Sequence, residues 1–412
     1  MADYKGIDYL RNKLNLKKSR VRMRYKHYEM KNIVRDFNIS TPPDLRYWMG
    51  TLGWCAKAVD TLADRLVFRE FDNDIFDMNG IFNMNNKDVL VDSALLGALI
   101  SSCDFIYITT DEDGFPLLRT IDGAHATGII DPITNMLKEG YAVLEFDDNG
   151  QPVTEAHFMI GETVVYQRGR IISTVKNDAP YALLVPMINR PDAVRPFGHS
   201  RISRACMSIV GSAVRTAKRS EVASEFFSFP QRYVLGMDED AERMDTWRAT
   251  MSSMLRIDKD QDGDHPVVGQ FQQQSMTPHT DQLRMFAGLF AGETGLTLDD
   301  LGFPSVNPSS ADAIKSSHET LRLTARKAQR DFGTGLLNAG YLAACVRDKF
   351  PYKRKQVYNV KPIWEPIFEP DASMLTTIGD GALKINQAVE GYFDADSLRN
   401  ITGIEPAGEN NG

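Results

Sequence analysis

Apolar residues recur every three or four positions in four long stretches of the chain, the pattern of amphipathic helices. The stretches are residues 44–66, 199–229, 277 to about 295, and 309–347. In 44–66 the recurring residues are Leu45, Trp48, Leu52, Cys55, Val59, Leu62 and Leu66. In 199–229 the apolar face is Ile202, Cys206, Ile209, Ala213 and Ala217, with Arg201, Arg204, Arg215, Lys218 and Arg219 largely off it. The spacing therefore predicts four helices, each packing one face.

From 105 to about 185 the pattern changes to short runs typical of strands. These runs are FIYITT, AVLEF, ETVVYQ and IISTV, and DEDG and DDNG between them are hairpin-turn sequences. An antiparallel β layer beside helices follows, and we expect it to end in the three-proline segment 185–198. The fold class predicted is α+β.

Further along, a strand at PQRYVLG, a short helix and a strand at PVVGQFQ predict a small α/β insertion. Thr277 with Pro278 at the first helical position begins the next helix, which should end near Gly295. Pro304 and Pro308 exclude a continuous helix. A strand in VYNVKPIWEPI and two short helices complete the chain.

The last long helix should begin after Pro308, because Ser309 and Asp312 have the spacing of a capping box. A helix over 309–347 would measure about 58 Å. Gly333, Gly335 and Gly340 are possible kink points.

Composition is that of an ordinary globular protein, with 42% hydrophobic and 25% charged residues in 412. No apolar run is long enough to cross a membrane, and the first ten residues lack the apolar segment of a secretory signal, so we expect synthesis in the cytoplasm. The four cysteines have no metal-type spacing, and we expect buried thiols.

Charge is unevenly distributed. Residues 1–35 hold 11 Lys and Arg against three acids, a balance of +8 within a net charge of −8, which leaves −16 for the rest. An acidic body disfavours tight DNA binding. The basic N-terminus suits a nucleic-acid arm or, as Tyr25, Tyr28 and Met30 suggest, an ordered partner-binding element, which we favour.

Candidate chemistry is sparse. Asp258, Asp260, Asp262 and Gly263 match the first half of a calcium loop, but its twelfth position is Gly269, so an acidic turn is the better interpretation. We find no nucleotide-binding motif. Gly288, Gly292 and Gly295 fit close helix packing and a helix cap instead.

Two other features have competing interpretations. His199 beside Ser200 lacks a nucleophile elbow and an assigned acid. Lys315, Arg322, Arg326 and Arg330 share one side of the last long helix, either as a solvated face or as a face near phosphates. No catalytic group, metal site or cofactor is predicted.

The order of elements resembles the portal (head-to-tail connector) proteins of tailed bacteriophages with long non-contractile tails. The resemblance includes the motifs RYKHYEMKNIVRDF, MTPHTDQLRMFAGLFAGETGL and NPSSADAIKSSHETLRLTARKAQRDFG, and the run from Met276 to Gly333 is its most specific part. The resemblance implies a dodecameric ring at one capsid vertex, located in the virion, with no enzymatic activity. The ring would conduct DNA during packaging and ejection. The alternative is a metal-dependent hydrolase or nuclease around Asp258, Asp260 and Asp262.

The resemblance also implies a division of the chain. Residues 1–196 would form the wing, 197–229 a stem helix, 230–276 the clip, 277–298 a second stem helix, 299–309 the tunnel loop, 310–349 a long kinked wing helix, 350–370 a returning wing strand, and 371–412 a short crown and tail.

Implied contacts follow that division. The tunnel loop around DNA would present Pro304, Ser305, Val306, Asn307, Pro308 and Ser309, and Lys315, Arg322 and Arg326 are a possible DNA-facing stripe. The clip would dock protein partners through Asp238, Glu239, Asp240 and Glu242, because residues 237–265 hold nine acids and four bases. The partners implied are other copies of the chain, the terminase large subunit, a head-tail adaptor, major capsid and scaffolding proteins, and non-specifically passing double-stranded DNA, with no membrane.

Overall fold

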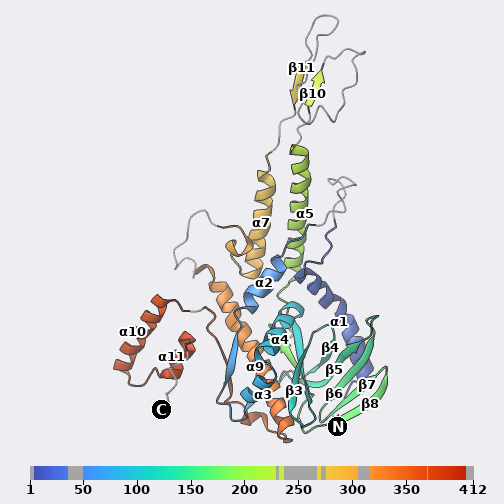
Figure 1. The fold of residues 1–412 in the computed structure, drawn as a ribbon, viewed down its shortest axis with the longest axis vertical. Helices are drawn as coiled ribbons and strands as arrows, with labels where there is room; N and C mark the ends of the chain where they lie inside the picture. The colour runs from blue at the N-terminus through green and yellow to red at the C-terminus, as the bar shows by residue number, and fades with distance from the viewer. Residues whose placement is uncertain are drawn as a thin grey trace, which may run out of the picture.

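A computed structural model describes residues 4–35, 50–228, 232–235, 267–270, 275–304, 316–368 and 370–404. It has an α+β body, from which a pair of helices projects, with a two-stranded ribbon beyond them (Figure 1). The predicted mixed fold class is confirmed. In the described part of the chain, we find no helix with the length and apolar character that a membrane crossing requires.

A five-stranded antiparallel sheet lies on one side of the body, in the order β4-β5-β6-β7-β8. Its strands are β4 (Ala126–Ile130), β5 (Leu137–Phe146), β6 (Pro152–Met159), β7 (Glu162–Gln167) and β8 (Arg170–Lys176). The predicted DDNG turn connects β5 to β6, and Gly150 there has φ 73°, in the left-handed region that favours glycine. The sequence correctly located β5, β7 and β8.

A second, three-stranded sheet has the order β3-β2-β9, with β2 (Cys103–Thr110), β3 (Pro116–Ile121) and β9 (Leu184–Ile188). The DEDG turn joins β2 to β3 as predicted. The segment expected to be a boundary instead begins with β9, all five residues of which are buried. Pro186 is tolerated there because β9 is an edge strand, where a missing N–H costs no ladder bond.

Helix α1 (Ile7–Tyr28) packs on the five-stranded sheet, burying Leu10 and Leu14 against Tyr141 and Val143. Arg11 donates through Nε and Nη2 to the two carboxylate oxygens of Glu155, at 3.0 and 2.7 Å. Burial raises the pKa of Glu155, but hydrogen bonds from Arg11 and Tyr141 outweigh it and hold that pKa below its usual value. The basic N-terminal segment is therefore an ordered helix fastened to its own body.

Helix α2 (Trp54–Ala63) is shorter than predicted, because residues 50–53 are not helical and the helix begins after Gly53. Leu45 and Trp48 lie outside the described residues. Helices α3 (Met78–Met84) and α4 (Lys87–Ser101) complete the N-terminal part of the body, and α4 contacts β2 and β3.

Helix α9 (Glu319–Arg347) is the long helix of the body and runs without a break through its three glycines. Its 29 residues span about 43 Å, so the length predicted for 309–347 was too great. The proposed capping box falls outside the described residues.

The three glycines of α9 permit close packing. A Cβ atom added at Gly333 would lie 2.8 Å from Pro362, one at Gly335 2.6 Å from the Met187 sulfur, and one at Gly340 2.8 Å from the Met78 sulfur. Pro362 belongs to β12 (Lys361–Trp364), which pairs with β1 (Phe68–Asp72). The α9 glycines thus let three separate elements approach the helix.

The projecting pair consists of α5 (Arg204–Ser228) and α7 (Thr277–Thr294). Met276 caps α7, one residue before the predicted cap, and Gly295 with φ 70° ends the helix as predicted. Beyond them, β10 (Arg232–Leu235) and β11 (Val267–Gln270) pair antiparallel, as the two predicted strands require. The short helix predicted between these strands lies outside the described residues.

Two basic residues of the α5 region were wrongly placed off the buried face. Lys218 is 6% exposed. Arg201, just before α5, donates to the carbonyl oxygens of Ala58 and Thr294 and so joins α2 to the end of α7. Burial lowers the pKa of Arg201 to about 10, which leaves it protonated at neutral pH.

After β12 the chain forms α10 (Ala372–Ala388) and α11 (Ala395–Thr402), which lie beside the body (Figure 1). Two short 3₁₀ turns, η2 (Asp299–Leu301) and η3 (Arg354–Gln356), precede and follow α9 in the chain. All four cysteines are buried free thiols, as predicted.

Asp104 on β2 is a buried carboxyl group, 3% exposed, whose Oδ1 atom has no hydrogen-bond partner. Burial, with the nearby Asp122 carboxylate, raises the pKa of Asp104 well above its ordinary value. No described cationic side chain pairs with the Asp104 carboxyl group, so its ionisation lowers the stability of the fold.

Candidate functional site

Of the six residues predicted to line a DNA-facing loop, the structure describes only Pro304. Pro304 is exposed, and Ser305, Val306, Asn307, Pro308, Ser309 and Lys315 lie outside the described residues. The chain reaches Pro304 through η2, whose Leu301 is buried, and through Gly302, which has φ 87°. The approach to the loop is thus a fixed part of the body.

The two ends of this segment are held close together. The Asp300 carboxylate accepts hydrogen bonds from the backbone N–H and hydroxyl of Thr297, at 2.9 and 2.8 Å. The same carboxylate lies 4.0 Å from His318 Nδ1, just before α9. A Cβ at Gly295 would also lie 2.8 Å from Thr320. Asp300 and His318, which stand on either side of residues 305–315 in the sequence, therefore lie close together.

The basic stripe of α9 divides into paired and unpaired members. Arg322 donates from Nε and Nη2 to both carboxylate oxygens of Glu319, at 2.7 Å each. This pairing lowers the pKa of Glu319. By contrast, neither Arg326 nor Arg330 makes an ion pair with a carboxylate among the described residues. The available positive charge therefore lies one to two turns further along the helix than Arg322.

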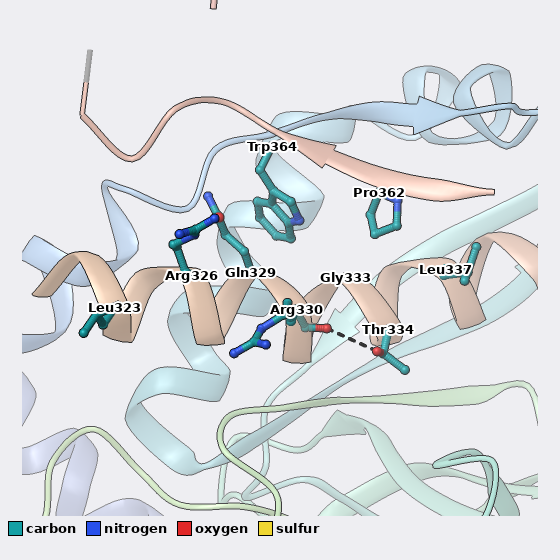
Figure 2. Close-up of a pocket in the computed structure, with 9 residues that line it drawn as sticks. All are labelled: Leu323, Arg326, Gln329, Arg330, Gly333, Thr334, Leu337, Pro362 and Trp364. Atoms are coloured by element: carbon teal, nitrogen blue, oxygen red, sulfur yellow. Dashed lines mark hydrogen bonds between the residues drawn. The ribbon is translucent and has the colours of Figure 1, made fainter. Parts of the chain in front are cut away.

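Arg326 and Arg330 line a groove of about 730 Å³ between α9 and β12. Figure 2 shows both guanidinium groups together with the indole of Trp364, which stands over the helix from β12. The full lining is Leu323, Arg326, Gln329, Arg330, Gly333, Thr334, Leu337, Pro362 and Trp364. The sequence identified the arginines, but Trp364 lies in a separate strand and no periodicity connected the two.

His199 has a carboxylate partner that the sequence did not reveal: its Nε2 lies 2.6 Å from Asp192 Oδ2. The neighbouring Ser200 hydroxyl donates to the carbonyl oxygen of Ile100 at 2.6 Å and so is used in packing the chain. This arrangement fixes the 189–200 loop and contains no positioned nucleophile.

The acidic candidates Asp238, Glu239, Asp240 and Glu242, and the calcium-loop residues Asp258, Asp260 and Asp262, fall outside the described residues. Within the described ranges, no group of three or more His, Cys, Asp or Glu side chains is placed to hold a metal ion.

Comparison with known proteins finds a family match in the region that contains the predicted loop and the groove. Residues 216–383 match the family model for phage portal proteins of the SPP1 Gp6-like type. The portal protein of Mycobacterium phage L5 is 22% identical over 331 residues, which cover 74% of this chain and 67% of that protein. In this region the chain is similar to phage portal proteins. The portal protein of Mycobacterium phage D29 is similar at 23% identity over 328 residues, with the same two coverages.

Two solved structures also align with this chain. One is a chain from the virion of a native gene transfer agent (GTA) particle, with a TM-score of 0.48, 13% identity, and coverage of 94% of this chain and 100% of that chain. The other comes from the neck of a native GTA particle computed with C12 symmetry, with a TM-score of 0.43, 14% identity and the same coverages.

The similarity to portal proteins distinguishes between the two functional classes that the sequence left open. A phage portal protein is a structural component of the virion, at the portal vertex, and is not an enzyme. The alternative of a metal-dependent hydrolase is therefore rejected.

Proposed function

We propose that twelve copies of this portal protein form a closed ring whose channel conducts DNA into the capsid and out of it. The observation that carries the proposal is the uncovered outer side of α7. Met285 and Leu289 are 51% and 54% exposed in the single chain. Gly288 and Gly292 have open space where a Cβ would stand, so no described residue of the same chain packs against them.

This α7 face suits contact with another copy. Met285, Gly288, Leu289 and Gly292 recur at helical spacing, which gives two apolar side chains beside a flat strip. A neighbouring helix can approach such a strip closely, and its approach would remove the exposed apolar area from water. A ring provides that neighbour to every copy at once.

The proposed tunnel loop, residues 299–309, begins at η2, where Asp300 lies 4.0 Å from His318. Small uncharged residues there suit passage of a duplex, because a phosphate anchor would retain the DNA. In this proposal Arg322 has little effect on DNA, since Glu319 already neutralises it.

We assign residues 1–196, 310–349 and 350–370 to the wing, 197–229 and 277–298 to the stem, 230–276 to the clip, and 371–412 to the crown and tail. The acidic clip would dock the terminase large subunit and, after packaging, a head-tail adaptor. Capsid and scaffolding proteins would contact the wing. These assignments rest on family likeness and on the charge of the sequence.

The loop is tested by Asn307→Lys, which would place twelve added cations at the narrowest point of the channel. We expect rings to assemble normally and packaging in a reconstituted system to stall. Lys315→Ala is the matched comparison, and we expect it to be milder. Normal packaging by Asn307→Lys particles would contradict the assignment of the loop.

The clip is tested by reversing Asp238, Glu239 and Asp240 to lysine. Ring assembly should persist while terminase binding, measured with the purified large subunit, weakens. Unchanged terminase binding and packaging would show that the docking surface lies elsewhere.

A further inference from the structure

The groove between α9 and β12 presents hydrogen-bond donors that have no acceptor among the described residues. The exposed guanidinium groups of Arg326 and Arg330 make no ion pair with a described carboxylate. The Trp364 indole, whose ring nitrogen can only donate, makes no hydrogen bond to a described residue. In Figure 2 Arg326 and Trp364 lie above α9 and Arg330 extends from its lower edge, and all three line the same groove. A ligand for this site must bring acceptor oxygens and negative charge.

The walls of the groove are apolar. Leu323 is 55% exposed, and Leu337 and Pro362 also border the cavity. Gly333 forms part of the floor, because a Cβ there would lie 2.8 Å from Pro362 and 3.6 Å from the Trp364 ring nitrogen. The site therefore combines two cations with surface for an apolar side chain.

This combination favours a peptide over DNA. A duplex offers phosphates along a rigid, strongly hydrated backbone and no flexible apolar group that could enter a groove beside Trp364. A peptide segment with a carboxylate next to an apolar residue satisfies both features, since a carboxylate can accept two hydrogen bonds from each guanidinium.

We propose that the groove binds an acidic segment of the neighbouring copy in the ring. Charge complementarity supports a second copy, because outside its basic first 35 residues each chain has a net charge of −16. The carboxylate contacts Arg326 and Arg330, and an adjoining apolar side chain packs on Leu323 and Trp364. The inference rests on the proposed ring and names one of its subunit contacts.

The first test reverses the charge of the groove with Arg326→Glu and Arg330→Glu in the full-length chain. The matched control, Arg170→Glu with Lys176→Glu on the exposed strand β8, makes the same charge change elsewhere. Assembly is followed by native mass spectrometry over a concentration series. We expect the groove variant to need at least roughly tenfold more protein to assemble than the control. Arg326→Gln with Arg330→Gln should have an intermediate effect.

Several outcomes would overturn the inference. One is assembly of the groove variant at the same concentration as the control, and another is equal impairment of both. A third is normal assembly combined with weakened DNA retention, which would assign the groove to phosphates. If the wild-type chain itself never assembles, the proposed ring fails, and that result is separate from any result on the variants.

The second test identifies the occupant directly and does not depend on loss of stability. A photoreactive benzoylphenylalanine replaces Leu323, and rings are assembled from equal amounts of ¹⁴N- and ¹⁵N-labelled chains. After illumination, we expect cross-linked peptides of mixed isotope composition, joined to a segment that contains Asp or Glu. Cross-links within single chains only, or none in assembled rings, would overturn the inference.

Discussion

Replacement of Met285 and Leu289 by glutamine removes the apolar part of the α7 outer face without adding charge. Complete burial of a Met or Leu side chain contributes about 1.5–3 kcal/mol. Each side chain is about half exposed in the single chain, at 51% and 54%, so burial of the remainder contributes about 1 kcal/mol. Together the two substitutions should weaken each subunit interface by about 2 kcal/mol, or roughly 30-fold in its association constant.

Sedimentation velocity over a concentration series measures this effect. Glutamine is a good helix former, so the variant should keep the circular dichroism spectrum of the wild-type chain. The control is Ile133→Gln with Val194→Gln, two loop residues that are 88% and 87% exposed. We expect the α7 variant to remain monomeric at concentrations where wild type and control form rings. Assembly of the α7 variant at wild-type concentrations would refute the assignment of this face.

Three further substitutions test the packing of the body. Asp104→Asn should stabilise the chain by about 1–3 kcal/mol at pH 7. Because folding raises the pKa of Asp104, this carboxyl group makes the fold less stable as pH rises, and has no such effect at low pH, where it is protonated in both the folded and the unfolded chain. The stability gained by Asp104→Asn should therefore shrink towards pH 4 in urea titrations. Gly198→Ala should destabilise the body by more than about 1 kcal/mol, since Gly198 has φ 71° and its added methyl would collide with the Asn189 carbonyl oxygen. Arg11→Ala leaves Glu155 buried without its cation, so amide exchange in α1 should accelerate at pH 7, and the difference from wild type should diminish as acid protonates Glu155.

Local patterns predicted most of the secondary structure. The turns DEDG and DDNG, and the cap at Gly295, were predictable because each depends on a few adjacent residues. Strands such as β9 were missed because burial on both sides removes the polar alternation that marks a half-exposed strand. The helix predicted over 44–66 was wrong at residues 50–53, because the apolar spacing that includes Leu52 extends beyond the start of the helix at Trp54.

The candidate site depended on contacts that sequence spacing does not encode. Helical periodicity grouped Arg322, Arg326 and Arg330, but only the structure showed that Glu319 pairs with Arg322 and that Trp364 lines the same groove as the other two. The kink predicted from glycines was a reasonable local inference. A glycine in a helix equally permits close approach of another element, and the choice depends on distant residues such as Met187 and Met78.

Electron cryomicroscopy of the purified 412-residue chain is the most direct test of the proposed ring. We expect a closed ring of about 554 kDa, twelve times the 46.2 kDa chain, with Pro304 nearer the axis than any residue of the five-stranded sheet. A stable monomer, or a ring with Pro304 on the outer rim, would contradict the proposal.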